Sequence, residues 1–276
     1  HWVSVCGEWR ANYPIIQPKY FEGELNSYRL VDVVTKHAKE NDIVIADTGS
    51  SCSVVAQTWQ VKKGQRVFIS GGLSGMGYWA TSLGLAEANR TNGTVICFVG
   101  DGSLQMNIHE FATIERNQIP IKIFLVSNDG YQFVRMSQSG YNINPTFGTD
   151  VSDGVPVPNM EKITKAYGLP YVSCSTAEEL DIVVKKVLAM EGPVVCEVFV
   201  SKNLEVEPRL RSIADENGVF HICTECCSYL FRINAYGIPE HLHFGAPVAV
   251  ADAESYLASC DQLFDYIVFT GGCLTA

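Results

Sequence analysis

Two short polar stretches carry the side chains of this sequence that are best suited to bind a ligand. Asp101 offers a carboxylate oxygen, Asn128 an amide oxygen and Gly130 a main-chain carbonyl. Such hard oxygen ligands suit Mg²⁺ or Ca²⁺, and Mg²⁺ usually completes its shell with water and phosphate oxygens. Gly102 and Ser103 stand where a helix is expected to begin, so free N–H groups there favour an anion. Together these residues predict a Mg²⁺-bridged diphosphate.

Two buried parallel strands are expected to position these groups. The apolar runs Thr94–Val99 and Ile121–Val126 precede the two polar stretches, as buried parallel strands do. Between them a helix is predicted from apolar residues that share one face, namely Leu104, Ile108, Phe111 and Ala112. The carboxyl ends of parallel strands are where open α/β sheets bind ligands. The alternative is an ordinary βαβ unit in which Asp101 only caps a helix.

The pattern Gly100-Asp101-Gly102, followed at the family's spacing by Asn128, resembles the fingerprint of thiamine diphosphate-dependent enzymes. The second Asn of that fingerprint is Asp129 here. The resemblance implies that Asp101, Asn128 and the Gly130 carbonyl hold the metal. The cofactor-binding residues that it implies are Gly100, Gly102, Ser103, Tyr131 and, by position after the strand Ile43–Ala46, Ser51, Cys52 and Ser53. Cys52 could equally be a packing residue.

A glycine-rich stretch, Gly71–Tyr78, resembles the corresponding segment of the acetolactate synthase branch of this family. There a Met supports the bent cofactor and main-chain carbonyls hold its pyrimidine, which implies these roles for Met76 and Gly75. A Met after such a turn is otherwise more often a core residue. The same stretch also satisfies a dinucleotide-binding pattern over Gly75–Ala80, so a NAD(P)- or flavin-dependent oxidoreductase is the main rival interpretation.

Composition narrows the class of protein further. The 276 residues are 47% apolar and 18% charged, which is enough for one sizeable core. A net charge of −10 argues against nucleic acid or an anionic membrane as partner. No apolar run approaches the ~18 residues of a membrane span, and no signal peptide is visible. We expect a cytoplasmic protein whose scattered cysteines are small buried hydrophobes: Cys97, Cys174 and Cys196.

The expected fold is α/β, a doubly wound parallel sheet with helices on both faces, plus an irregular C-terminal tail. Residues 1–24 resemble the connector that precedes the cofactor domain in acetolactate synthase-like enzymes, residues 25–220 form that domain, and residues 221–276 form a tail of unknown role. The connector and the first residue, His1 in place of Met, lead us to expect a fragment that lacks upstream domains. In the tail, Cys223, Cys226, Cys227, His241 and His243 suggest zinc, but their spacing fits a zinc finger poorly.

The resemblance implies an enzyme in which thiamine diphosphate and Mg²⁺ support decarboxylation and carboligation of small 2-keto acids. The activating glutamate of that family lies in a pyrimidine-binding domain, usually from another subunit of a homodimer or homotetramer, and Glu110 is not that residue by position. The isolated chain is therefore expected to be inactive, with FAD possible only through absent domains. A non-catalytic subunit that binds diphosphate and Mg²⁺ is the remaining alternative. Arg135 is interpreted as a solvated helix cation in preference to a substrate-facing one.

Overall fold

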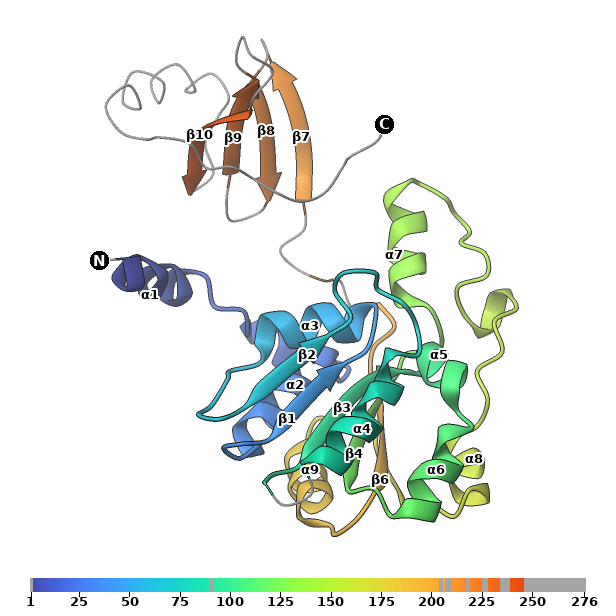
Figure 1. Cartoon of the computed structure of the whole chain (residues 1–276). Helices are drawn as coiled ribbons and strands as arrows, with labels where there is room; N and C mark the ends of the chain where they lie inside the picture. Colours follow the sequence, from blue (N-terminus) through green and yellow to red (C-terminus); the bar gives the residue numbers. More distant parts are fainter. Residues whose placement is uncertain are drawn as a thin grey trace. The chain divides into compact units, whose positions relative to one another are not determined.

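The computed structural model describes residues 2–89, 92–203, 206, 210–216, 219–224, 228–233 and 239–245. The chain divides into two compact units, His1–Val206 and Glu207–Ala276, and each is described by itself (Figure 1). None of the helices in these residues is long and apolar enough to cross a membrane.

The first unit is built on a six-stranded sheet with the order β2-β1-β3-β4-β6-β5, and every neighbouring pair is parallel. The strands are β1 Ile43–Ala46, β2 Arg66–Ile69, β3 Val95–Gly100, β4 Ile121–Ser127, β5 Tyr171–Cys174 and β6 Val194–Phe199. From β1 the chain first moves outward to β2 and then returns to β3 on the other side. The carboxyl ends of β1 and β3 therefore meet at a topological switch point, where α/β sheets bind ligands.

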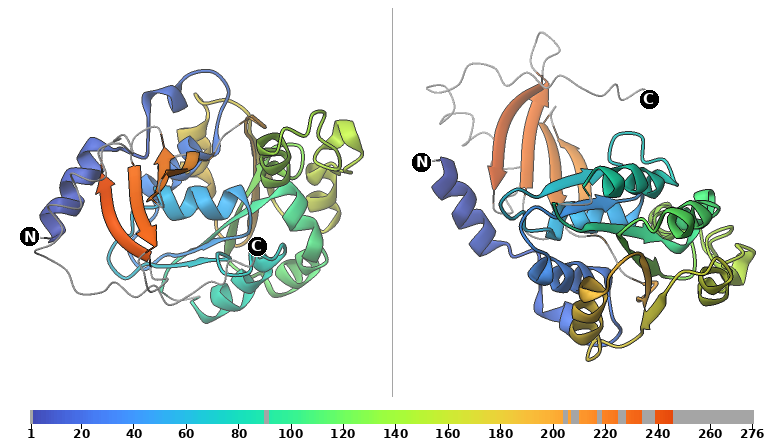
Figure 2. Two further views of the ribbon diagram at one scale, coloured as in Figure 1. Left: turned by 90° about the horizontal axis from the view of Figure 1, so that it is seen from above. Right: turned by 60° about the horizontal axis from the view of Figure 1, so that its bottom comes forward.

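Helices cover both faces of this sheet (Figure 2). One face carries α2 Ser27–His37, α3 Ser50–Thr58 and α9 Leu180–Ala189, and the other carries α4 Thr81–Ala88, α6 Glu110–Asn117 and α8 Met160–Ala166. Because successive strand residues point to opposite faces, Ile96 and Phe98 pack with the first group, whereas Cys97 and Val99 pack with the second. Both faces are apolar, so the strands read as continuous hydrophobic runs. The doubly wound prediction is confirmed.

Further helices and 3₁₀ turns complete the first unit. They are α1 Trp2–Asn12, η1 Pro18–Phe21, η2 Tyr78–Ala80, α5 Asp101–Leu104, η3 Gln105–Asn107, α7 Gln132–Gly140 and η4 Val151–Asp153. The single helix expected after β3 is thus divided into α5, η3 and α6. Its buried apolar positions are Leu104, Phe111 and Ile114, whereas Ala112 is exposed. The break shifts the helical phase, so a face counted from Leu104 does not continue through residue 112.

A helix cap and three buried cysteines are two local features of the first unit. The side chain of Asn26 caps α2 by accepting a hydrogen bond from the N–H of Arg29 at 3.0 Å. Cys97, Cys174 and Cys196 are buried free thiols, and burial raises the pKa of each. They therefore pack as small neutral side chains, as expected.

The predicted tail needs a correction for its described residues. Four strands, β7 Leu210–Glu216, β8 Val219–Thr224, β9 Ser228–Ile233 and β10 Pro239–Gly245, form an antiparallel sheet in sequence order. β8 crosses the boundary that we placed between residues 220 and 221. Leu230 and Leu242 are buried on this sheet, with Val219 packed against them. The signal was present, since short runs of aromatic and aliphatic residues separated by turn residues favour such a meander.

Lys122 is a buried cation at the amino end of β4. It is 3% exposed, and its Nζ donates to the carbonyl of Gly192 at 2.7 Å and to that of Met190 at 2.5 Å. These carbonyls follow α9, whose last carbonyls have no intrahelical donor. Lys122 therefore ties the carboxyl end of α9 to the central strand, at the sheet edge opposite to the polar stretches.

Replacement of Lys122 by Met should lower the free energy of unfolding by about 1–3 kcal/mol, because two carbonyls lose their donor. Chemical denaturation followed by circular dichroism measures the change. Lys165→Met is the control, because Lys165 pairs with Glu161 on an exposed helix surface; its effect should stay within about 0.5 kcal/mol. An equal loss in the free energy of unfolding for the two substitutions would contradict the role of Lys122 in joining α9 to β4.

Candidate functional site

Asp101 lies at the centre of the polar carboxyl edge of the sheet. It is the first residue of α5, directly after β3, and is 0% exposed. Its Oδ1 accepts the N–H of Gly102 at 2.7 Å, and its Oδ2 accepts the N–H groups of Asn128 at 2.9 Å and Gly130 at 3.2 Å. A carboxylate can accept about four hydrogen bonds, so capacity remains for one further bond. Asp101 therefore fixes the ends of β3 and β4 to each other and can still bind a cation.

The electrostatics of Asp101 favour a cation. Burial raises the pKa of Asp101 to about 6 and Asp129 adds to this rise, although the three main-chain hydrogen bonds oppose it. A buried carboxylate is stabilised by a nearby positive charge. A bound metal ion would therefore stabilise the ionised form of this buried carboxylate.

Asn128 has one side-chain atom that the fold leaves unused. Its N–H donates to Asp101, its carbonyl accepts from Arg135 Nη2 at 3.3 Å, and its Nδ2 donates to Gln132 Oε1 at 2.9 Å. In contrast, its buried Oδ1 has no hydrogen-bond partner among the described residues. A buried acceptor without a partner is costly, and a metal ion would satisfy it. This atom is the strongest observation in favour of the predicted metal site.

The main chain after Asn128 is arranged around a tight turn. Asp129 and Gly130 have φ of 63° and 131°, and a Cβ on Gly130 would lie 2.4 Å from the carbonyl oxygen of Thr149. The N–H of Tyr131 donates to that oxygen at 2.7 Å. Only glycine fits at residue 130, and the turn returns the chain so that its backbone stays beside Asp101.

Gly102 does not play the predicted role of a free anion donor. Its N–H is used by Asp101, and a Cβ at this position would lie 2.3 Å from Cε1 of Tyr131. Glycine is needed here because the ring of Tyr131 packs against it. Gly102 and Tyr131, which were both predicted to bind the cofactor, are therefore in contact with each other.

Asp47, a residue that the sequence analysis missed, connects β1 to this edge. It is 0% exposed and its Oδ2 accepts from Ser103 Oγ at 2.8 Å and from the N–H of Trp79 at 3.2 Å. Ser103 Oγ in turn accepts the N–H of Gly77 at 2.9 Å. The available signal was its position, since Asp47 follows a buried strand just as Asp101 does. Ser103 is thus engaged in holding the glycine-rich stretch against α5.

The glycine-rich stretch reaches the same edge after β2. Gly77 has φ of 91°, and its carbonyl accepts from Asn107 Nδ2 at 2.7 Å. Met76, the preceding residue, is 48% exposed, so the core interpretation of this Met does not hold. Gly75 accepts a hydrogen bond from Ser70 Oγ at 3.4 Å. The structure thus leaves the Met76 side chain accessible to a ligand.

The first turn of α3 supplies main-chain N–H groups beside β1. α3 begins at Ser50 after Gly49, which has φ of 72°. The N–H groups of a helical first turn lack intrahelical partners and attract anions. Ser51 and Cys52 in this turn are buried, whereas Ser53 is partly exposed. Burial, with a smaller effect from Asp47, raises the pKa of Cys52, so its thiol stays neutral.

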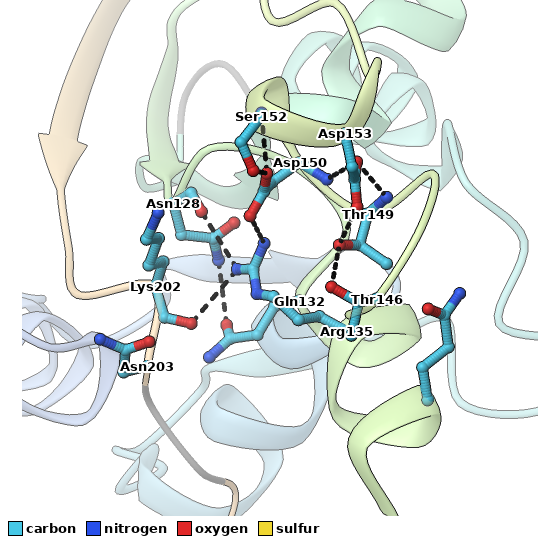
Figure 3. Close-up of polar contacts among 12 residues, drawn as sticks. Asn128, Gln132, Arg135, Thr146, Thr149, Asp150, Ser152, Asp153, Lys202 and Asn203 are labelled. Carbon is cyan, nitrogen blue, oxygen red and sulfur yellow. Dashed lines mark hydrogen bonds and ion pairs between the residues drawn. The ribbon is translucent and has the colours of Figure 1, made fainter. Parts of the chain in front are cut away.

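Arg135 is not the solvated cation that we expected. Its side chain is 14% exposed, and its guanidinium donates to Asp150 Oδ2 at 3.5 Å and to the carbonyls of Asn128 and Lys202 at 3.3 and 3.2 Å (Figure 3). Five guanidinium donors in a fixed fork allow one side chain to bind several carbonyls. Arg135 therefore joins α7 to the end of β4, to the segment after β6 and to the loop that contains Asp150.

The loop after α7 is held in turn by Asp150 and Asp153. Asp150 caps η4 through the N–H of Ser152 at 2.8 Å, and hydrogen bonds from Ser152 lower the pKa of Asp150. Asp153 accepts from Thr149 Oγ1 at 2.8 Å (Figure 3). An isolated bridge pairs Gly130 with Asp150. The loop is therefore ordered against the turn that follows Asn128.

A cluster of three or more His, Cys, Asp or Glu side chains that could hold a metal does not occur within the described residues. The predicted magnesium site is of another kind, since it uses one carboxylate, one amide and one carbonyl oxygen. Of the residues in the zinc hypothesis, Cys226 and Cys227 lie outside the described residues, and the structure describes only the main chain of Cys223 and His241.

The fold and this edge define a cofactor-binding domain of the thiamine diphosphate class. The family model described as "Thiamine pyrophosphate enzyme, C-terminal TPP binding domain" matches residues 47–198, which is more than half of the chain. The chain belongs to this family. The family match favours the thiamine diphosphate interpretation over the dinucleotide-binding alternative.

Known relatives point to one branch. The chain is 27% identical over 208 residues to acetolactate synthase isozyme 1 large subunit of Escherichia coli K12, covering 75% of this chain and 36% of that protein. It is 27% identical over 207 residues to the acetolactate synthase large subunit of Pyropia yezoensis (75% and 34%) and over 189 residues to that of Lactococcus lactis (68% and 32%). The chain thus spans about a third of the length of these relatives.

Gly130→Ala should destabilise the first unit by about 1–3 kcal/mol, because it combines a strained positive φ with a collision against the Thr149 carbonyl. Thermal unfolding measures the loss. Gly84→Ala is the control, since a Cβ there meets nothing within 4 Å inside α4; it should stabilise by about 0.5–1 kcal/mol. A neutral Gly130→Ala would show that the turn is not constrained in this way.

Arg135→Met should free the loop from α7, because Asp150 and two carbonyls lose their common donor. Hydrogen exchange should accelerate at the N–H groups of Tyr131 and Val155, which donate to Thr149 and Asp150. Arg66→Met removes an exposed cation that lies 5.0 Å from the ring centroid of Phe68 on edge strand β2 and should leave both amides unchanged. Equal protection in all three proteins would refute the role assigned to Arg135.

Proposed function

We propose that this chain supplies the diphosphate- and Mg²⁺-binding part of an acetolactate synthase-like enzyme that acts on 2-keto acids. The observation that carries the proposal is the unpartnered buried Oδ1 of Asn128 beside the buried carboxylate of Asp101. Both are hard oxygen ligands, as Mg²⁺ requires. The proposal explains why an otherwise satisfied Asn leaves this atom without a partner.

The residues of this edge would bind the metal ion and the diphosphate through different groups. Asp101, Asn128 Oδ1 and the Gly130 carbonyl would hold the metal ion. The first turn of α3, with Ser51, would offer N–H groups to a diphosphate, because the N–H of Gly102 is already engaged. Neutral Cys52 beside that turn adds no negative charge that would repel the diphosphate.

The glycine-rich stretch would contact the organic part of the cofactor. Met76 is accessible and Gly77 is fixed to α5 and η3 through Ser103 and Asn107, so the Met would be presented from a braced loop. The main-chain carbonyl of Gly75, next to it, accepts one long hydrogen bond from Ser70 and has a second lone pair for the cofactor. Thiamine diphosphate, when bound, supplies the electron sink for cleavage beside a keto carbon.

The complete enzyme would need further parts. We propose a pyrimidine-binding domain as partner, within a homodimer or homotetramer, and a cytoplasmic location. The identity of the 2-keto acid and any use of FAD would be decided by those parts. Without the partner's glutamate, the chain alone would bind cofactor and show no turnover, because general-base help of this kind is typically worth about 10²–10⁴-fold.

Asp101→Ala should abolish Mg²⁺-dependent binding of thiamine diphosphate, because a ligand and its charge are both lost. Titration calorimetry with and without Mg²⁺ measures it, on the chain of residues 1–276. Glu161→Ala, which removes an exposed carboxylate paired with Lys165, is the matched control and should bind normally. Unchanged affinity in Asp101→Ala would rule out the metal site.

The Mg²⁺ dependence should also vary with pH. Because the pKa of Asp101 is raised to about 6, a proton competes with the metal below that value. Well above this pKa the carboxylate is ionised, and affinity should be constant. Below it, apparent affinity for Mg²⁺ should fall about tenfold per pH unit, as measured by calorimetry. Constant affinity between pH 7 and 5 would contradict this assignment.

A further inference from the structure

Gln132 contacts the side chain of Asn128, the residue whose Oδ1 we propose as a metal ligand. It is the first residue of α7, is 3% exposed, and accepts the Nδ2 hydrogen of Asn128 at 2.9 Å (Figure 3). The turn through Asp129 and Gly130, with its two positive φ values, returns the chain so that residues 128 and 132 meet.

The contact matters because an amide has two different ends. One end of the Asn side chain can bind a cation through oxygen, and the other carries N–H donors that a cation repels. An acceptor that engages Nδ2 therefore selects the orientation in which Oδ1 is turned away from it. In this structure Oδ1 is the buried, unpartnered atom.

The main chain of Asn128 is fixed by separate contacts. Its N–H donates to Asp101 and its carbonyl accepts from Arg135, one turn after Gln132 on α7. With the main chain held at both ends, the side-chain torsions of Asn128 remain free, and the hydrogen bond to Gln132 restricts them.

We propose that Gln132 is a positioning residue that sets the amide orientation of Asn128 and thereby prepares its Oδ1 for the metal. This inference rests on the proposed function, since it assumes a metal at Asp101 and Asn128. Gln132 acts through Asn128 and does not touch the metal.

Gln132→Met tests the idea, with Mn²⁺ and inorganic diphosphate as probes and the residues 1–276 chain as protein. In the metal-bound form of this variant, Nδ2 of Asn128 is left buried without an acceptor. Its affinity for Mn²⁺, measured from the free-ion electron paramagnetic resonance signal, should fall about tenfold. Gln132→Asn keeps a polar side chain that is one methylene too short to reach Asn128, so it should show the same loss of Mn²⁺ affinity. This variant replaces Gln132→Met in the test if the methionine variant does not fold.

The Asn128→Asp background separates a positioning role of Gln132 from a purely structural one. Both terminal atoms of Asp are oxygens, so orientation no longer matters. In this background Gln132→Met should change Mn²⁺ affinity by less than about twofold, which a double-mutant cycle expresses as coupling. An equal loss in both backgrounds would mean that Gln132 acts through general stability and would overturn the proposal.

Lys122→Met is the matched stability control. Lys122 is also a buried polar residue that makes hydrogen bonds near one end of β4, but it lies at the amino end, far from Asn128. It should lower the melting temperature and leave Mn²⁺ affinity unchanged. Wild-type affinity in both Gln132→Met and Gln132→Asn would refute the positioning role while leaving the proposed function intact. A wild-type chain that binds no Mn²⁺ with diphosphate would instead contradict the proposed function, and this inference with it.

Discussion

The hydrogen bonds that Asp101 accepts from the main chain are the contacts on which the polar edge depends. One carboxylate joins its own helix turn at Gly102 to Asn128 and Gly130 at the end of the neighbouring strand. Burial makes this charge costly, and the raised pKa of Asp101 records that cost. The arrangement keeps a strained turn and an unpartnered amide oxygen in place, which fits a site that a cation completes.

A second buried carboxylate repeats the arrangement one strand away. Asp47 holds Ser103 and Trp79, and Ser103 holds Gly77. The ends of β1 and β3 and the glycine-rich stretch after β2 are thus connected by hydrogen bonds near the switch point of the sheet. The loop after α7 joins the same system through Arg135 and Asp150. The edge is therefore a braced surface, and rigid support of this kind favours precise placement of ligands.

Much of the fold follows from patterns that are local in the sequence. Continuous apolar runs predicted the strands, and their order along the chain placed Asp101 and Asn128 at one edge. The sequence did not predict that Gly102 has no free N–H, because that depends on which atom the Asp101 carboxylate reaches. Nor did it predict the burial of Arg135, since its partners Asp150 and Lys202 lie 15 and 67 positions away. The antiparallel sheet was missed because its strands were not assessed by their own period, and the predicted boundary at residue 220 assigned β7 to the cofactor domain.

The central claim is that Asp101, Asn128 and Gly130 together hold a divalent metal. Anomalous X-ray scattering from crystals of the chain grown with Mn²⁺ and thiamine diphosphate would test it most directly. The account predicts one strong peak about 2.1 Å from an Asp101 carboxylate oxygen, from Asn128 Oδ1 and from the Gly130 carbonyl. A peak elsewhere, or an Asn128 amide whose nitrogen faces the metal, would contradict it.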